Sequence, residues 1–264
     1  MSKKLLFCLI FLLAGIGVAQ GAVTGKEVTY RTETTELKGY IAYDDAISAR
    51  RPGVLVVHEW WGLNDYARKR AEMLAQAGYV ALAVDMYGEG KTAGHPDEAG
   101  KFSAAVKTNL PEARKRFLAG MEVLKGNPFT DPTRIAAIGY CFGGGMVLQM
   151  ARDGLDLKGV VSFHGTLDTN EPAKAGAIKA EILVFHGGAD KFIPMEAIQA
   201  FVKEMTEAGA DFTFHSFPGA LHSFTNPGAD ELGKKFKLPL AYQAKADQDS
   251  WRETMAFFTR IFGR

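Results

Sequence analysis

Cysteine is scarce in this chain, whose 264 residues include only Cys8 and Cys141. Cys8 lies in an apolar N-terminal run, so a chain processed after that run would hold one thiol and no internal disulfide. In an oxidising compartment a lone thiol is a liability unless it is buried or used. Cys141 is therefore a candidate for a functional role.

An excess of charge of one sign is also missing, because 31 Lys and Arg residues stand against 30 Asp and Glu residues. This balance gives no indication of a nucleic-acid partner or of an anionic membrane surface. No Pro/Gly/Ser-rich linker, internal repeat or low-complexity tract divides the chain. We therefore expect one soluble globular domain over residues 22–264.

The first 21 residues have the layout of a secretory signal peptide. Lys3 and Lys4 precede an apolar run from Leu5 to Val18, and small residues follow. The run is short for a membrane span, which needs about 20 residues. We predict an exported protein, periplasmic or secreted, without membrane association after cleavage, and an uncleaved anchor is the alternative. The pattern determines neither the cleavage position nor whether the protein is a monomer or a dimer.

Short apolar runs alternate with helical patterns from residue 54 onward. A β-branched run such as 54–57 is typical of a strand buried on both faces. This order predicts an α/β fold with a mostly parallel central sheet, helices on both faces, and functional residues just after the strands. The expected strands are 27–31 and 38–43, which form a hairpin, then 54–57, 80–84, 134–138, 160–163, 182–185 and 212–217. The expected helices are 65–77, 98–106, 112–124, 142–152, 194–208 and 240–261, and Asp131-Pro132 is an expected turn.

The segment Gly139-Tyr140-Cys141-Phe142-Gly143 joins an expected strand directly to an expected helix. This is the setting of a nucleophile elbow, in which a strained turn exposes the central side chain and needs very small residues two positions away. The N–H groups and the dipole of the following helix favour a thiolate. Glycine-rich turns of this kind also bind phosphates, and buried cysteines are common, so a structural role stays open.

A thiol nucleophile needs a base and an acid that orients it, in the chain order nucleophile, acid, histidine. His222 follows the last expected strand and has the right place for the base. Asp190 follows strand 182–185 and is the favoured acid, with Asp168 as its rival in a polar stretch. The remaining downstream histidines are less suited: His164 and His186 end strands and could line a site, and His215 lies within a strand.

Two other motifs do not fit their chemistry. Gly88-Glu89-Gly90-Lys91-Thr92 ends like a phosphate loop, but Asp85 stands where the first glycine is required. His58-Glu59 resembles the start of a zinc-protease motif, but the second histidine position is Gly62. We expect neither a nucleotide, a metal ion nor an organic cofactor.

Taken together, the motifs resemble the dienelactone hydrolase family of the α/β-hydrolase superfamily over roughly residues 27–262. The matching segments are His58-Glu59-Trp60-Trp61-Gly62, Asp85-Met86-Tyr87, Gly139-Tyr140-Cys141-Phe142-Gly143-Gly144, Gly187-Gly188-Ala189-Asp190 and His222-Ser223-Phe224. The resemblance implies a triad of Cys141, Asp190 and His222. It also implies that Glu59 contacts the resting thiol and takes part in its activation, and that the backbone N–H groups of Trp60 and Phe142 form the oxyanion hole.

The chain departs from the family at the two arginines that hold a substrate carboxylate. Glu89 and Asn226 stand near the expected places, and Lys91 is a nearby cation. Because lysine does not replace a bidentate arginine clamp, a neutral or differently charged ester or lactone is expected as substrate. The residues expected to line the substrate pocket are Trp61, Tyr87, Lys91 and Phe224, although the aromatic ones fit core packing equally well.

The predicted function is hydrolysis of a small carboxylic ester or lactone through a thioester formed on Cys141. Two alternatives stay open. One is a binding or thiol-reactive protein that kept the fold without catalysis. The other is acyl transfer or peptide cleavage by the same three residues.

Overall fold

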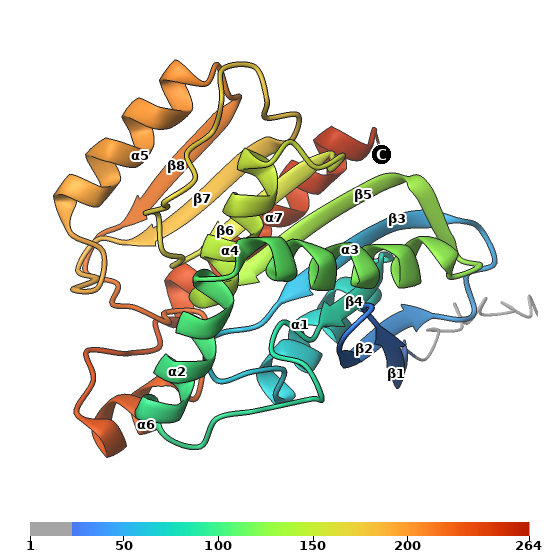
Figure 1. Cartoon of the computed structure of the whole chain (residues 1–264), viewed down its shortest axis with the longest axis horizontal. Helices are drawn as coiled ribbons and strands as arrows, with labels where there is room; N and C mark the ends of the chain where they lie inside the picture. Colours follow the sequence, from blue (N-terminus) through green and yellow to red (C-terminus); the bar gives the residue numbers. More distant parts are fainter. Residues whose placement is uncertain (1–22, 264) are drawn as a thin grey trace, which may run out of the picture.

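The computed structural model describes residues 23–263, which form a twisted sheet between two layers of helices (Figure 1). The expected signal peptide over residues 1–21, with Cys8, lies outside the described residues. The strands are β1 (Val23–Arg31), β2 (Glu36–Asp44), β3 (Arg51–Val57), β4 (Val80–Val84), β5 (Thr130–Tyr140), β6 (Gly159–Phe163), β7 (Glu181–Gly187) and β8 (Phe212–Phe217). The helices are α1 (Asp65–Gln76), α2 (Pro96–Lys107), α3 (Leu110–Gly126), α4 (Phe142–Arg152), α5 (Met195–Glu207), α6 (Ala229–Phe236) and α7 (Ala244–Phe262).

The strand order in the sheet is β1-β2-β4-β3-β5-β6-β7-β8. β1 and β2 form the expected antiparallel hairpin, and β2 pairs antiparallel with β4. All pairs from β4 through β8 are parallel. The prediction of an α/β fold with a mostly parallel sheet is confirmed.

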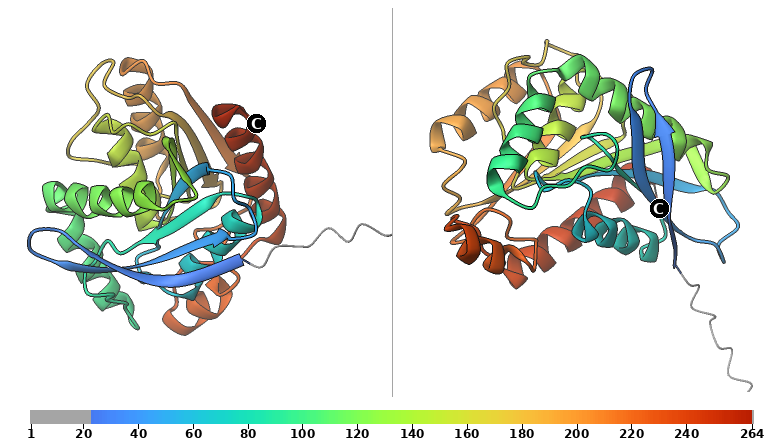
Figure 2. Two further views of the ribbon diagram at one scale, coloured as in Figure 1. Left: turned by 90° about the vertical axis from the view of Figure 1, so that its right-hand side faces the viewer. Right: turned by 60° about the horizontal axis from the view of Figure 1, so that its bottom comes forward.

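The central strands are apolar because helices cover both of their faces. Along β3, Val54 and Val56 join the core beneath α1 and α7, whereas Leu55 and Val57 join the core beneath α3, α4 and α5. This is the alternation that a strand imposes on successive side chains. Figure 2 shows the two helix layers on either side of the sheet.

The prediction of one long helix over 240–261 is wrong at its start. α7 begins at Ala244, and Leu240 instead forms an isolated parallel bridge with His222. Backbone hydrogen bonds to the His222 loop hold this segment outside the helix: the N–H of Ala241 donates to the carbonyl oxygen of His222, and the N–H of Gln243 donates to that of Phe224. The preceding helix α6 was not predicted, because it has only 8 residues and holds Gly233, a residue of low helix propensity.

Strand β5 is longer than predicted and includes the expected turn at Asp131-Pro132. The side chain of Asp131 accepts the backbone N–H of Thr133, as in a turn, and the register with β3 shifts between Pro52 and Gly53. The turn signal therefore marks an irregularity within a strand. Between residues 23 and 263, none of the helices combines the length and apolarity that crossing a membrane requires.

The fold brings the functional candidates to one end of the sheet. Because β3, β5, β6 and β7 run parallel, their carboxyl ends meet at the same edge. Figure 1 shows α2 and α6 beyond this edge, next to the start of α4.

Candidate active site

Cys141 occupies a strained turn between β5 and α4. Its φ angle is 53° and its ψ angle is −117°, a conformation that L-residues rarely adopt. Close backbone contacts explain both flanking glycines. A Cβ on Gly139 would lie 2.1 Å from the carbonyl oxygen of Gly143, and a Cβ on Gly143 would lie 2.3 Å from that of Val57. The predicted elbow geometry is present, and the thiol of Cys141 is partly exposed.

The two residues expected to form the oxyanion hole, Trp60 and Phe142, lie beside the elbow. Phe142 is the first residue of α4, so its N–H has no acceptor within the helix. Trp60 lies in the loop after β3, and the side chains of Trp60, Phe142 and Cys141 line one cavity. Trp60 in the loop and Phe142 at the start of α4 therefore both lie at the cavity of the thiol, and their role as an oxyanion hole stays a prediction.

His222 and Asp190 are in direct contact. The Nδ1 atom of His222 lies 2.7 Å from Oδ2 of Asp190, whose side chain is completely buried. The other oxygen of Asp190, Oδ1, accepts the backbone N–H of Phe192 at 2.8 Å. With both carboxylate oxygens hydrogen-bonded, Asp190 fixes the orientation of the His222 ring.

The electrostatics of His222 link it to the thiol. Burial disfavours the imidazolium, but the neighbouring Cys141 and Asp190 outweigh burial and raise the pKa of His222 to about 10. Cys141 is the largest of the influences that raise the pKa of His222, and the two side chains line the same cavity. His222 therefore holds a proton most firmly when Cys141 is a thiolate.

Glu59 is buried beside this group, but its contacts differ from those that the resemblance implies. Its Oε1 accepts the Ser223 hydroxyl at 2.9 Å, and its Oε2 accepts the Asn226 amide at 2.7 Å. Within residues 23–263 neither oxygen has a hydrogen bond to Cys141. Burial raises the pKa of Glu59, and the two neutral donors together with His222 and Arg70 oppose the rise. Asn226, which stands near the place expected for one of the two arginines, thus holds Glu59.

The cavity next to Cys141 has a volume of about 130 Å³. Its wall is mostly apolar, and Lys107 on α2 contributes a cation that forms no ion pair within the described residues. The lining residues are Trp60, Ser103, Lys107, Cys141, Phe142, Thr166, Phe192, His222 and Leu240. Phe192 is close in sequence to Asp190, whereas Ser103, Lys107 and Leu240 carry no local signal and reach the cavity only through tertiary packing.

Two of the expected pocket residues lie in the protein interior instead. Phe224 is fully buried and packs against His164 and Phe217. Trp61 is 4% exposed and stacks on Phe236 of α6. Their apolar side chains stabilise the loops that carry His222 and Trp60 and do not face the cavity, so the prediction for these two residues is wrong.

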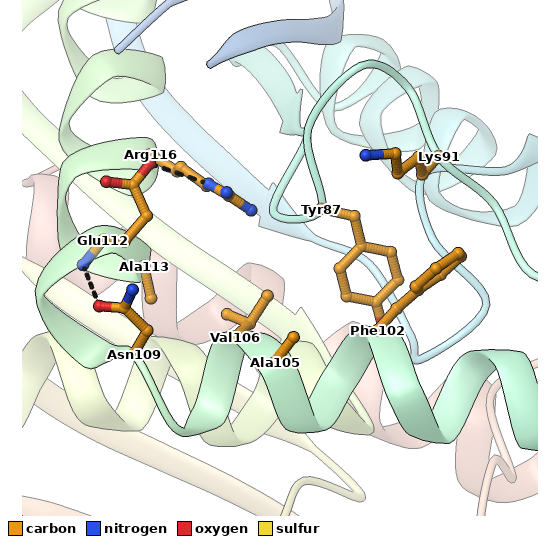
Figure 3. A pocket seen from close by; sticks show the side chains of 9 residues that line it. All are labelled: Tyr87, Lys91, Phe102, Ala105, Val106, Asn109, Glu112, Ala113 and Arg116. Atoms are coloured by element: carbon orange, nitrogen blue, oxygen red, sulfur yellow. Dashed lines mark hydrogen bonds and ion pairs between the residues drawn. The ribbon is translucent and has the colours of Figure 1, made fainter. Parts of the chain in front are cut away.

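Tyr87 and Lys91 line a neighbouring cavity of about 200 Å³ between α2, α3 and the loop after β4 (Figure 3). In this view Lys91 and Arg116 extend toward each other from opposite sides of the cavity. Tyr87 donates its hydroxyl to the carbonyl oxygen of Trp60, and its ring contacts Phe142. Tyr87 thus contacts two residues that line the cavity of Cys141, but neither Tyr87 nor Lys91 lines that cavity.

The remaining candidates have structural contacts. Asp168 is exposed and lines a small separate cavity, whereas His215 pairs with Glu253 on the surface. His58 bonds the carbonyl oxygen of Glu59 and accepts the N–H of Met86. Asp85 accepts backbone N–H groups of the glycine-rich loop, which explains why that loop resembles one that holds an anion. Among residues 23–263 no three His, Cys, Asp or Glu side chains gather as a metal site.

Comparison with known proteins identifies the family. The dienelactone hydrolase family model matches residues 37–262. This chain belongs to the dienelactone hydrolase family. A curated relative, protein usf of Aquifex pyrophilus, is 30% identical over 89% of this chain and 97% of its own length. Membership makes the protein a hydrolase of the α/β-hydrolase fold, consistent with a small ester or lactone as its substrate.

Solved structures agree with this assignment. A dienelactone hydrolase-like promiscuous phosphotriesterase from metagenomic libraries is 34% identical and superposes with a TM-score of 0.85, covering 91% of this chain and 99% of that one. A dienelactone hydrolase from Anabaena variabilis, at 22% identity and a TM-score of 0.59, covers 83% of this chain and 99% of that one. The second likeness concerns the fold alone.

Proposed function

We propose that this protein hydrolyses small carboxylic esters or lactones, with Cys141 as nucleophile, His222 as acid and base, and Asp190 as the residue that orients His222. The observation that carries the proposal is the elbow conformation of Cys141 on the cavity wall beside the 2.7 Å pair of His222 and Asp190. A nucleophile, a base and an orienting acid in contact are the usual arrangement of covalent acyl transfer.

In the acylation step the Sγ thiolate attacks the carbonyl carbon, and the carbonyl oxygen becomes an oxyanion. The N–H groups of Trp60 and Phe142 would stabilise this charge, a contribution of about 3 kcal/mol per donor in other enzymes. The imidazolium of His222 gives its proton to the departing alkoxide, which leaves as an alcohol. A thioester on Cys141 remains.

The raised pKa of His222 suits both halves of the reaction. With a thiolate beside it, His222 is protonated at neutral pH and can act as the acid. Acylation removes the negative charge of the thiolate, so the pKa of His222 falls and its neutral ring can take a proton from water. The hydroxide formed attacks the thioester, and the carboxylic acid is released with the thiolate restored.

The cavity favours short and mostly apolar acyl groups. Its volume of about 130 Å³ is below the roughly 300 Å³ at which typical pockets for drug-sized ligands begin. Trp60, Phe142 and Phe192 supply apolar contacts, and no arginine lines the wall. This supports a neutral substrate, in line with the missing arginine clamp.

The proposal is tested with p-nitrophenyl acetate and butyrate and with small lactones. We expect turnover by the wild type, none by Cys141→Ala, and a circular dichroism spectrum that the substitution leaves unchanged. Alcohol or amine acceptors in the same assay separate hydrolysis from acyl transfer. Turnover that survives in folded Cys141→Ala, or none by the wild type on the whole panel, would refute the proposal.

A neutral phosphotriester is a second candidate substrate. The 34% identical relative is named as a promiscuous phosphotriesterase. In this protein the cavity beside the Cys141 thiol is mostly apolar, which suits a neutral triester. Release of p-nitrophenol from a diethyl phosphotriester, compared between wild type and Cys141→Ala, decides whether the same site accepts it.

A further inference from the structure

A second buried histidine, His164, lies directly beneath the nucleophile, and the mechanism above does not use it. It follows β6 with a φ angle of 40°, so its backbone is strained, like that of Cys141. Its ring is 1% exposed and stands edge-on to the ring of His222, with 5.2 Å between the centroids. A buried, strained histidine this close to the reacting groups needs an explanation.

The hydrogen bonds of His164 define its tautomer. Its Nδ1 accepts the backbone N–H of Cys141 at 3.2 Å. The same N–H also donates to the carbonyl oxygen of Phe163. Because a backbone N–H only donates, Nδ1 carries no proton. The proton is therefore on Nε2, which lies 2.8 Å from the hydroxyl oxygen of Thr225.

Thr225 connects this histidine to a rigid support in α1. Its hydroxyl lies 2.6 Å from the hydroxyl of Tyr66, which accepts the Nε–H of Arg70 at 3.2 Å. Arg70 also donates to the carbonyl oxygen of Thr225 and pairs with Asp247 of α7. A continuous set of buried hydrogen bonds thus runs from α7 and α1 to the backbone of the nucleophile.

We propose that His164 is a positioning residue, which holds the Cys141 backbone in the elbow conformation through its unprotonated Nδ1 and takes no proton from the substrate or the thiol. A proton on Nδ1 would oppose the N–H of Cys141 and break the contact. Thr225 keeps the ring in the required tautomer. His222 and His164 thus have separate tasks, proton transfer and backbone support.

The charges around His164 favour its neutral form. Burial, then the positive charges of His222 and Arg70, hold its pKa well below the usual value. The other titratable groups that face the ring are Cys141 in the elbow, Tyr140 of β5, which contacts it, and Tyr66 of α1 beyond Thr225. Among these neighbours only the Cys141 thiolate of the proposed mechanism is negative, and it lies beside the imidazolium of His222, whose positive charge opposes a proton on His164.

The first test measures the ring nitrogens of the wild-type protein by ¹⁵N NMR between pH 5 and 8. We expect the Nε2–H tautomer of His164 throughout, without titration, while His222 stays protonated. A proton on Nδ1, or titration of His164 between pH 6 and 7, would overturn the proposal. This measurement needs no substrate, so it stands apart from the proposed function.

The second test compares two substitutions by their acylation rates, and it rests on the proposed function. His164→Asn keeps an acceptor near the Nδ1 position and tolerates positive φ, so we expect kcat/KM within about fivefold of wild type. His164→Phe removes both hydrogen bonds, and we expect kcat to fall at least about thirtyfold with KM nearly unchanged.

Thr225→Val serves as a matched variant if His164→Phe does not fold, because it is close in shape and leaves His164 in place. We expect it to lower kcat about tenfold and to let Nδ1–H appear in the NMR spectrum. Equal losses in His164→Asn and His164→Phe, or wild-type rates in Thr225→Val, would contradict the positioning role.

Discussion

Replacing Asp190 by asparagine tests the relation between acid and base most sharply. The buried carboxylate accepts two hydrogen bonds, from His222 at 2.7 Å and from the Phe192 N–H at 2.8 Å. In asparagine the amide oxygen can accept the Phe192 N–H, but the amide NH₂ then faces His222. It can donate to Nδ1 only if the His222 proton is on Nε2. In that tautomer His222 no longer accepts a proton from the thiol.

The magnitude follows from the interaction that is lost. A hydrogen bond to a charged group contributes about 1.5–3 kcal/mol, and 1.36 kcal/mol is a factor of ten in rate. We therefore expect Asp190→Asn to lower kcat/KM for p-nitrophenyl acetate about 10- to 100-fold. The free energy of unfolding in urea should fall by about 1–3 kcal/mol, because one buried group loses its partner.

Asp168→Asn is the matched control, because Asp168 is the rival acid in the sequence and is exposed in the structure. We expect it to keep wild-type kinetics and stability. A folded Asp190→Asn variant with activity within threefold of wild type, or an equal loss of activity in the Asp168 variant, would show that Asp190 does not orient the base.

Four further predictions concern charge, pH and processing. Lys107→Met should lower kcat/KM for esters with a carboxylate near the reacting carbonyl at least about fivefold and leave neutral esters within twofold, as a paired ester series would measure. In Cys141→Ala the pKa of His222 should fall from about 10, followed by NMR titration, because the thiolate that raises it is gone. The folded-state pKa of His164 lies below its unfolded value of about 6.5, so its contribution to stability is complete above pH 6.5 and is lost as the pH falls below it. The free energy of unfolding should then fall by up to about 1.4 kcal/mol per pH unit. Urea unfolding from pH 7 to 5 should show a smaller loss of stability in His164→Asn than in wild type. Export would remove residues 1–21, so N-terminal sequencing of protein from the periplasm or medium of a bacterial host should begin near residue 22.

The sequence was sufficient for the sheet and for the residues that local patterns define. The apolar run of β3 predicted burial on both faces, and the glycines around Cys141 predicted the elbow, because the steric demand of that turn is local. His222 and Asp190 followed from their positions after β8 and β7. Their contact depends on parallel strands that end at one edge, which the alternation of elements already implied.

The features that could not be predicted from the sequence depend on packing between distant segments. Lys107 and Leu240 line the cavity only because α2 and the segment before α7 come together over the elbow. Phe224 follows the base within two residues, yet its side chain points into the core. The support of His164 by Thr225 joins residues 61 positions apart, and no spacing rule indicates such a pair.

Cys141 is the residue that we propose carries the acyl group. The most direct test of this role is to mix the protein with a slowly deacylating ester, quench in acid, digest, and measure the mass of the peptide that contains Cys141. We expect this peptide to gain the mass of the acyl group, transiently in wild type and for longer in Asp190→Asn. An unmodified Cys141 peptide during active turnover, or acyl mass on another residue, would contradict this role.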